Sequence, residues 1–130
     1  MELPKDIEVY QDELAFYWME NDMLLCSVTK STPRTVENII STFELIEEIT
    51  EGKKVCLLSD TTATGSRPDY ARAISIKMVV NYFKALAMFS ISPFGKLVVN
   101  SFITVSCEPI PMKLFSNELE AREWLNEYLE

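Results

Sequence analysis

The segment that most constrains the fold is a short apolar run that leads directly into a hydroxyl-rich loop. The run is Val55–Asp60, the loop carries four hydroxyl side chains over residues 61–66, and a helix is predicted from Pro68. Strand–loop–helix units of this kind build open α/β domains, in which the loops at the carboxyl ends of the strands form the binding surface. We therefore expect an α/β domain whose functional surface lies over residues 60–72.

The other apolar runs predict how the strands pair. Leu14–Met19 and Met23–Val28 are rich in β-prone residues and are separated by a short polar gap with Asn21 and Asp22, which predicts an antiparallel hairpin. Two later runs, Lys84–Ile91 and Met112–Phe115, each follow a segment with helical periodicity. Strands that alternate with helices pair in parallel, so the strands after the hairpin should be parallel.

The predicted helices begin at residues suited to capping a helix N-terminus, and most of these residues stand beside a proline. The starts are Thr32 with Pro33, Ser66 or Arg67 with Pro68, Ser92 with Pro93, and Asn117 with Glu120 as a capping box. The first helix should run to Gly52, and Pro109 forbids extension of the third. The predicted order is ββαβαβαβα: a single mixed, mostly parallel sheet with an N-terminal antiparallel hairpin and packed helices.

Composition limits the class of protein. A chain of 130 residues with 48% hydrophobic content should form a single domain over residues 1–130. The net charge of −8 disfavours nucleic acid as a partner. Cys26, Cys56 and Cys107 are odd in number and lie in apolar runs, which indicates reduced thiols in a cytoplasmic protein. The N-terminus does not resemble a signal peptide, and no apolar run is long enough to span a bilayer, so no membrane insertion is expected.

The sequence contains no histidine, which excludes much catalytic chemistry. Ser-His-Asp and Cys-His mechanisms are impossible within this chain, and zinc loses its commonest nitrogen ligand. The acidic residues show no calcium-loop pattern, so we expect no metal and no cofactor. Asp60, Arg67, Asp69 and Arg72 could form an acid–base set, but nothing in the sequence defines a substrate, and we expect the protein not to be an enzyme.

Three segments of the second half carry a family resemblance: Ser92–Leu97, Pro111–Phe115 and Glu120–Leu125. With them, the chain resembles the small bacterial STAS/SEC14-like domains related to sporulation anti-sigma-factor antagonists. The resemblance implies a mixed sheet with packed helices, no established catalysis for many members, and roles in protein-partner switching or in binding apolar small molecules. Antagonists of this kind carry a phosphorylated serine within Asp-Ser-Ser-Gly at a helix start. The matching region here is residues 60–66, Asp-Thr-Thr-Ala-Thr-Gly-Ser, which lacks that motif.

The loop after the third predicted strand has two interpretations. In the first, its polar side chains only cap the next helix and satisfy backbone N–H groups. In the second, one hydroxyl accepts a phosphate that the helix N-terminus and two arginines stabilise, so that the loop is a phospho-switch or a partner-binding site. The candidate residues are Asp60, Thr61, Thr62, Thr64, Ser66, Arg67 and Arg72.

Two classes of function follow from these observations. The first is a non-enzymatic regulatory or protein-interaction module that uses this loop, with a protein partner whose identity the sequence does not give. The second is a carrier or sensor of a small apolar ligand such as a lipid, because residues 74–80 and 97–99 carry more apolar side chains than one buried stripe requires. A homodimer interface would cover the same surface, and a homodimer is therefore expected.

Overall fold

The computed structural model describes residues 1–63, 69–93 and 110–129. Its six strands form one sheet in the order β1-β2-β3-β4-β5-β6. Strand β2 pairs antiparallel with both β1 and β3, and the neighbouring strands from β3 to β6 pair in parallel. The strands are β1 (Tyr10–Gln11), β2 (Ala15–Asn21), β3 (Leu24–Thr29), β4 (Val55–Asp60), β5 (Phe83–Phe89) and β6 (Met112–Phe115). The predicted fold class, with its N-terminal hairpin and later parallel strands, is confirmed.

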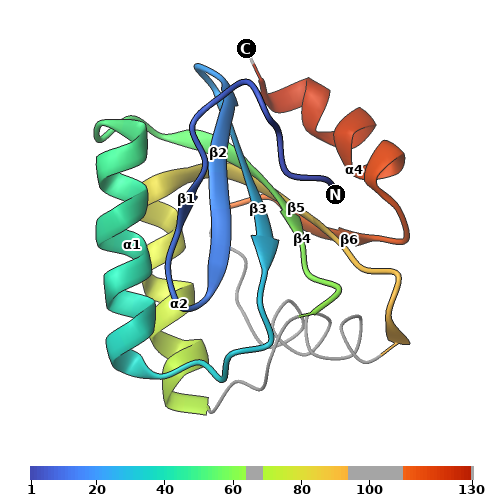
Figure 1. Cartoon of the computed structure of the whole chain (residues 1–130). Helices are drawn as coiled ribbons and strands as arrows, with labels where there is room; N and C mark the ends of the chain where they lie inside the picture. The colour runs from blue at the N-terminus through green and yellow to red at the C-terminus, as the bar shows by residue number, and fades with distance from the viewer. Residues whose placement is uncertain (64–68, 94–109, 130) are drawn as a thin grey trace.

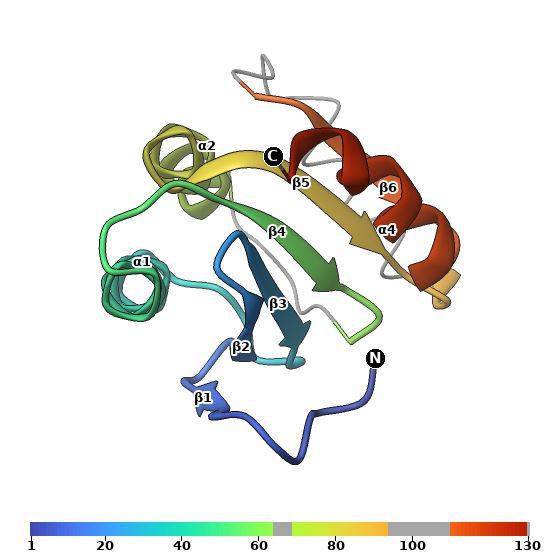
Figure 2. The same ribbon diagram turned by 90° about the horizontal axis from the view of Figure 1, so that it is seen from above.

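The described helices cover both faces of the sheet. Helices α1 (Val36–Thr50) and α2 (Asp69–Tyr82) lie side by side on one face, and α4 (Glu118–Leu125) covers the other (Figures 1 and 2). A short 3-10 turn, Asn126–Tyr128, follows α4. The third predicted helix, from Pro93 to residue 105, lies almost wholly outside the described residues.

The two-sided covering explains why the central strands are nearly continuous apolar runs. Alternate residues of a strand point to opposite faces, so Leu25 of β3 packs towards α1 and α2 while Cys26 packs towards α4. Strand β4 divides in the same way at Val55 and Cys56. Both cysteines are buried free thiols, and burial together with Glu20 raises the pKa of Cys26 to about 12. They are therefore unreactive core residues, whereas Cys107 lies outside the described residues.

The prediction for the start of the first helix is wrong. The N-cap is Thr35, not Thr32, and the helix begins at Val36 and not at Pro33. The Thr35 hydroxyl accepts the Asn38 N–H at 3.1 Å, and the Asn38 side chain accepts the Thr35 N–H at 2.8 Å. This reciprocal pair satisfies two backbone donors at once, which the Thr32-Pro33 start does not offer.

The predicted end of β5 and the predicted start of α4 lie closer to the boundaries in the structure. Strand β5 ends at Phe89, so Ile91 lies beyond it and is 75% exposed. Asn117 caps α4 as predicted, since its side chain accepts the Glu120 N–H at 2.9 Å. The Glu120 carboxylate completes the pair by accepting from the Asn117 side-chain amide at 2.7 Å and not from its backbone.

We expect Thr35→Ala to lower the free energy of unfolding by about 1 kcal/mol, the usual cost of a lost N-cap. The substitution removes the acceptor of the Asn38 N–H and leaves a donor at the helix start without a protein partner. Thr32→Ala is the matched control, because Thr32 lies before the helix. Urea unfolding of both variants checks the prediction. Equal losses of unfolding free energy in the two variants would contradict the assignment of Thr35 as the N-cap.

Candidate functional site

The predicted functional loop begins with three described residues, each of which makes structural hydrogen bonds. Asp60 accepts from the N-terminal ammonium of Met1 at 2.6 Å and from the Thr62 N–H at 3.0 Å. The Thr61 hydroxyl donates to the Phe89 carbonyl at 3.0 Å. The Thr62 hydroxyl accepts the Ile91 N–H at 3.4 Å. The bonds of the Thr61 and Thr62 hydroxyls join the carboxyl end of β4 to that of β5, and the bond from Met1 holds the N-terminus to Asp60.

The remaining predicted site residues are described only in part. Thr64, Ser66 and Arg67 lie outside the described residues, and of Arg72 only the backbone, within α2, is described. The structure therefore brings Asp60, Thr61 and Thr62 together. Phosphorylation of this loop stays a prediction.

Asp60 gives an expected pH dependence. Burial alone would raise the pKa of Asp60, but the hydrogen bonds from the Met1 ammonium and from Thr62 outweigh it and hold the pKa below its ordinary value. A carboxylate whose pKa is lower in the folded chain stabilises the fold above its unfolded pKa of about 4, and this stabilisation disappears as the pH falls through the folded value. We expect the acid-induced loss of stability below about pH 5 to be shallower in Asp60→Asn than in the wild type. Urea midpoints at several pH values check this, and parallel curves for the two proteins would contradict it.

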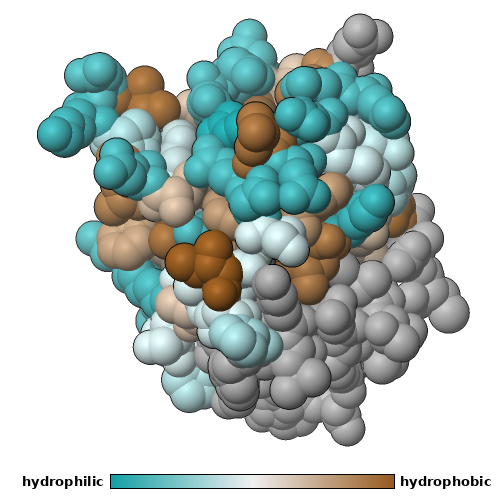
Figure 3. Space-filling view, turned by 90° about the vertical axis from the view of Figure 1, so that its right-hand side faces the viewer, coloured by the Kyte–Doolittle hydropathy of each residue, from teal (hydrophilic) through white to brown (hydrophobic). Residues whose placement is uncertain are grey.

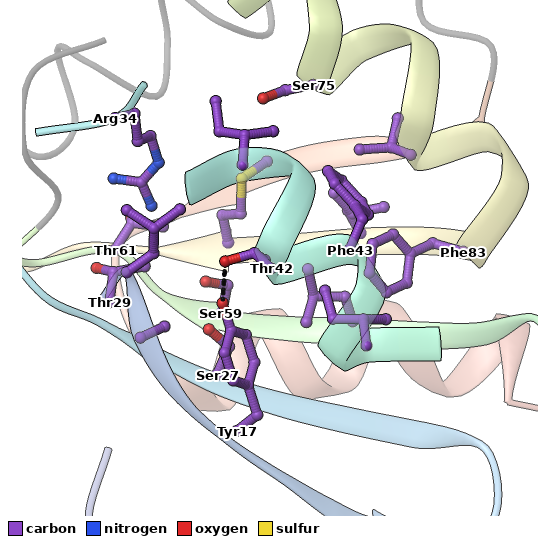
Figure 4. Close-up of a pocket in the computed structure, with 18 residues that line it drawn as sticks. Tyr17, Ser27, Thr29, Arg34, Thr42, Phe43, Ser59, Thr61, Ser75 and Phe83 are labelled. Atoms are coloured by element: carbon purple, nitrogen blue, oxygen red, sulfur yellow. Dashed lines mark hydrogen bonds between the residues drawn. The ribbon is translucent and has the colours of Figure 1, made fainter. Parts of the chain in front are cut away.

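Directly beside this loop, a cavity of about 120 Å³ lies between the sheet and helices α1 and α2. Thr61 lines it, so the cavity and the loop share a residue. In Figure 4, Arg34, Thr29 and Thr61 lie towards one end of the cavity, and Phe43 and Phe83 lie towards the other. The cavity therefore has a polar end and an apolar end. The sequence analysis did not predict this cavity.

The cavity exists because small hydroxyl residues occupy the middle and the end of two central strands. Strand β3 presents Leu25, then Ser27 and Thr29, to the face under α1 and α2, because alternate residues share a face. Ser59 of β4 is the register partner of Ser27, and Thr61 follows it on the same side. These side chains are too small to fill the space below the helices. The sequence signal for this cavity was a serine within each of two apolar strands. Only the register between the strands places Ser27 and Ser59 side by side.

The serine hydroxyls face the cavity without protein partners. Ser27 and Ser59 are only 4% and 5% exposed. Within the described parts of the chain, neither hydroxyl makes a hydrogen bond to another protein group. Each can therefore donate to a molecule in the cavity, and each can accept from one.

Tyr17, in contrast, belongs to a chain of hydrogen bonds. Its hydroxyl donates to Thr42 at 3.3 Å, and the Thr42 hydroxyl donates to the Asp12 carboxylate at 2.6 Å. Burial, with a further contribution from the charge of Asp12, raises the pKa of Tyr17 well above its ordinary value. Tyr17 is therefore a neutral phenol at any physiological pH, and its ring and Thr42 form a fixed wall of the cavity.

Arg34 is the only charged side chain among the described residues that line the cavity. It directly precedes the N-cap of α1 and is only 8% exposed. Its Nη1 atom is buried and has no hydrogen-bond partner in the described structure. Burial lowers the pKa of Arg34, but an arginine remains protonated in proteins, so the cavity contains a positive charge.

The described residues around the cavity carry apolar groups, hydroxyls and one guanidinium. No carboxylate, thiol or imidazole is among its described lining residues, so no group there could act as a general base of ordinary strength. Across the residues that the structure describes, no cluster of three or more acidic or cysteine side chains could hold a metal ion. Within the same residues, no helix is long and apolar enough to cross a membrane.

On the side view of Figure 3, hydrophobic and hydrophilic residues are interspersed over the described part of the surface. The apolar residues 97–99, on which the dimer prediction partly depends, lie outside the described residues, as do the side chains of Ile74 and Ile76. The homodimer stays a prediction.

The architecture defines a class of protein. A solved structure of an uncharacterised protein from the DUF3478 family, with a SpoIIAA-like fold and from Shewanella loihica PV-4, is similar to this chain with a TM-score of 0.55. The two share 18% sequence identity over 96% of this chain and 98% of the other, which establishes a common fold and no more. The resemblance to STAS-like domains is thereby confirmed at the level of the fold.

The family is established separately. Residues 17–129 match the model of a domain of unknown function, DUF7793, and the chain belongs to this family. No curated protein is matched by the sequence.

Proposed function

We propose that this protein is a non-enzymatic regulatory module that senses a small amphipathic molecule in the cavity between the sheet and helices α1 and α2. One observation carries the proposal: the cavity has an apolar end, and it is also lined by Ser27 and Ser59, two residues of low exposure whose hydroxyls no described protein group binds. Buried polar groups in folded proteins nearly always have partners. A ligand supplies partners for Ser27 and Ser59, and its apolar part displaces water from the other end.

The volume sets the size of the ligand. A purely apolar cavity of about 150 Å³ accommodates benzene, so a cavity of 120 Å³ suits a molecule of about that size or slightly smaller. Long-chain lipids do not fit within it. The ligand is thus a short molecule with one polar group, and this narrows the apolar-ligand alternative that the sequence left open.

The regulatory part of the proposal depends on Thr61. This residue lines the cavity, and its hydroxyl holds the Phe89 carbonyl at the ends of β4 and β5. A molecule bound in the cavity would therefore affect the start of the predicted partner-binding loop through Thr61. Phosphorylation within that loop would involve Thr62, Thr64 or Ser66 more readily than Thr61, because Thr61 is only 4% exposed and is already bonded.

Two neighbouring residues of α1 provide a matched test of ligand binding. Ile39 is 3% exposed and lines the cavity, whereas Ile40 is 41% exposed and does not line it. We expect Ile39→Phe to fill part of the cavity and weaken binding about tenfold or more, a change of about 1.4 kcal/mol. Ile40→Phe should bind like the wild type.

The measurement is a titration of amide NMR shifts with benzene, isopentanol, isovaleramide and isovalerate. Shifts that map to the cavity in the wild type and in Ile40→Phe, but not in Ile39→Phe, support the proposal. It fails if none of the four molecules binds the wild type, or if Ile39→Phe binds as tightly as Ile40→Phe. Slower hydrogen exchange over residues 60–72 in the presence of the bound molecule tests the regulatory part, and unchanged exchange there contradicts it.

A further inference from the structure

Arg34 carries a positive charge at the wall of the cavity. It makes no ion pair with a described residue, although the residue is only 8% exposed. Asp12 acts on it only through its charge. The Asp12 oxygens are already engaged: Oδ1 accepts from Leu14 N–H at 2.9 Å and Ala15 N–H at 3.1 Å, and Oδ2 accepts from Thr42.

Burying a charge without a partner costs roughly several kcal/mol of free energy, so native proteins pair such charges or bind an ion with them. The orientation of Arg34 indicates where its partner would lie. In Figure 4 the guanidinium points into the cavity on the side of Thr29 and Thr61, away from Phe43 and Phe83. An anion in the polar end of the cavity would therefore meet the guanidinium there.

The other groups of the polar end fit the same chemistry. Ser27 and Ser59 can both donate a hydrogen bond to an oxyanion, and no described lining residue carries a negative charge that would repel it. The planar guanidinium presents a fork of N–H donors that matches the two oxygens of a carboxylate. A phosphate fits less well, because a fully polar ion leaves the apolar end around Phe43 and Phe83 unfilled.

We propose that the molecule bound in this cavity is a small monocarboxylate, with its carboxylate on the Arg34 guanidinium and its short branched or ring-shaped body between α1, α2 and the sheet. This inference rests on the proposed ligand-binding function and specifies the charge of the ligand. Arg34 is then the residue that determines specificity for an acid over its neutral analogues.

Isovalerate and isovaleramide test this charge requirement, because they have nearly the same shape and differ by one charge. We expect the wild type to bind isovalerate at least about tenfold more tightly than isovaleramide, since hydrogen bonds to charged groups contribute about 1.5–3 kcal/mol. Arg34→Met keeps the length of the side chain and removes its charge, so it should lose this preference and still bind the amide. Arg34→Lys restores a charge without the fork and should show an intermediate preference.

The outcomes separate the two proposals. Equal binding of acid and amide by the wild type overturns the inference and leaves the cavity function intact, whereas binding of neither overturns both. Inorganic phosphate that displaces isovalerate at equal concentration overturns the carboxylate assignment. A parallel loss of acid and amide binding in Arg34→Met would show that Arg34 only shapes the cavity, and near-ultraviolet circular dichroism of that variant confirms that its core is intact.

Discussion

Replacement of Phe83 by alanine is expected to lower the free energy of unfolding by about 3–5 kcal/mol, the range for large aromatic residues in well-packed cores. Phe83 is 2% exposed at the start of β5. Its ring centroid lies 6.5 Å from that of Phe43 on α1 and 6.5 Å from that of Tyr82 on α2, so one side chain joins both helices to the sheet. The loss comprises the transfer of the ring, these aromatic contacts and the enlarged cavity.

Phe16→Ala is the matched control for this substitution. Phe16 lies on the edge hairpin, is only partly buried and has the Lys30 ammonium 4.5 Å from its ring centroid. We expect it to cost clearly less than Phe83→Ala in urea unfolding. Phe83→Ala should also shift the ligand preference towards larger molecules, because Phe83 lines the apolar end of the cavity. Equal losses in the two variants would mean that Phe83 does not join the helices to the sheet.

The second large expected effect is an increase in the free energy of unfolding. Arg34→Met should raise the free energy of unfolding of the ligand-free protein by about 1–3 kcal/mol, because it removes a buried polar group that no described residue satisfies and keeps most of its apolar volume. A residue that destabilises the empty fold is expected where binding requires it. Saturating isovalerate should reduce the difference in unfolding free energy between Arg34→Met and the wild type, because it stabilises only the wild type appreciably.

Arg122→Met provides the contrast. Arg122 is partly exposed and donates to Glu20 at 2.8 Å and to Glu118 at 2.7 Å. Its replacement should lower the stability by no more than about 1 kcal/mol, as is usual for surface ion pairs. Thermal and urea unfolding of both methionine variants measure the two signs. A loss of stability in Arg34→Met comparable to that in Arg122→Met would show that Arg34 has a structural partner.

Local sequence signals were sufficient where a boundary depended on neighbouring residues, and they were wrong where two local solutions competed. Asn117 caps α4 as predicted, with its side chain accepting the Glu120 N–H. Before α1, both Thr32 and Thr35 could act as the cap. The reciprocal pair with Asn38 decided for Thr35, and the later start leaves Arg34 outside the helix with its side chain turned inwards. The two-residue strand β1 was missed, because only its pairing with β2 identifies it.

The sequence by itself determined the alternation of strands and helices, and with it the change from antiparallel to parallel pairing, because periodicity, caps and turn residues act over a few positions. It also predicted a functional region at the end of β4, and this stays a prediction. Only the tertiary structure decided the strand order and the cavity. Ser27 and Ser59 are far apart in the chain, and they become neighbours because β3 and β4 pair in one register out of several. The inward position of Arg34 has the same origin, since burial depends on the elements that pack around a residue and not on its neighbours in the sequence.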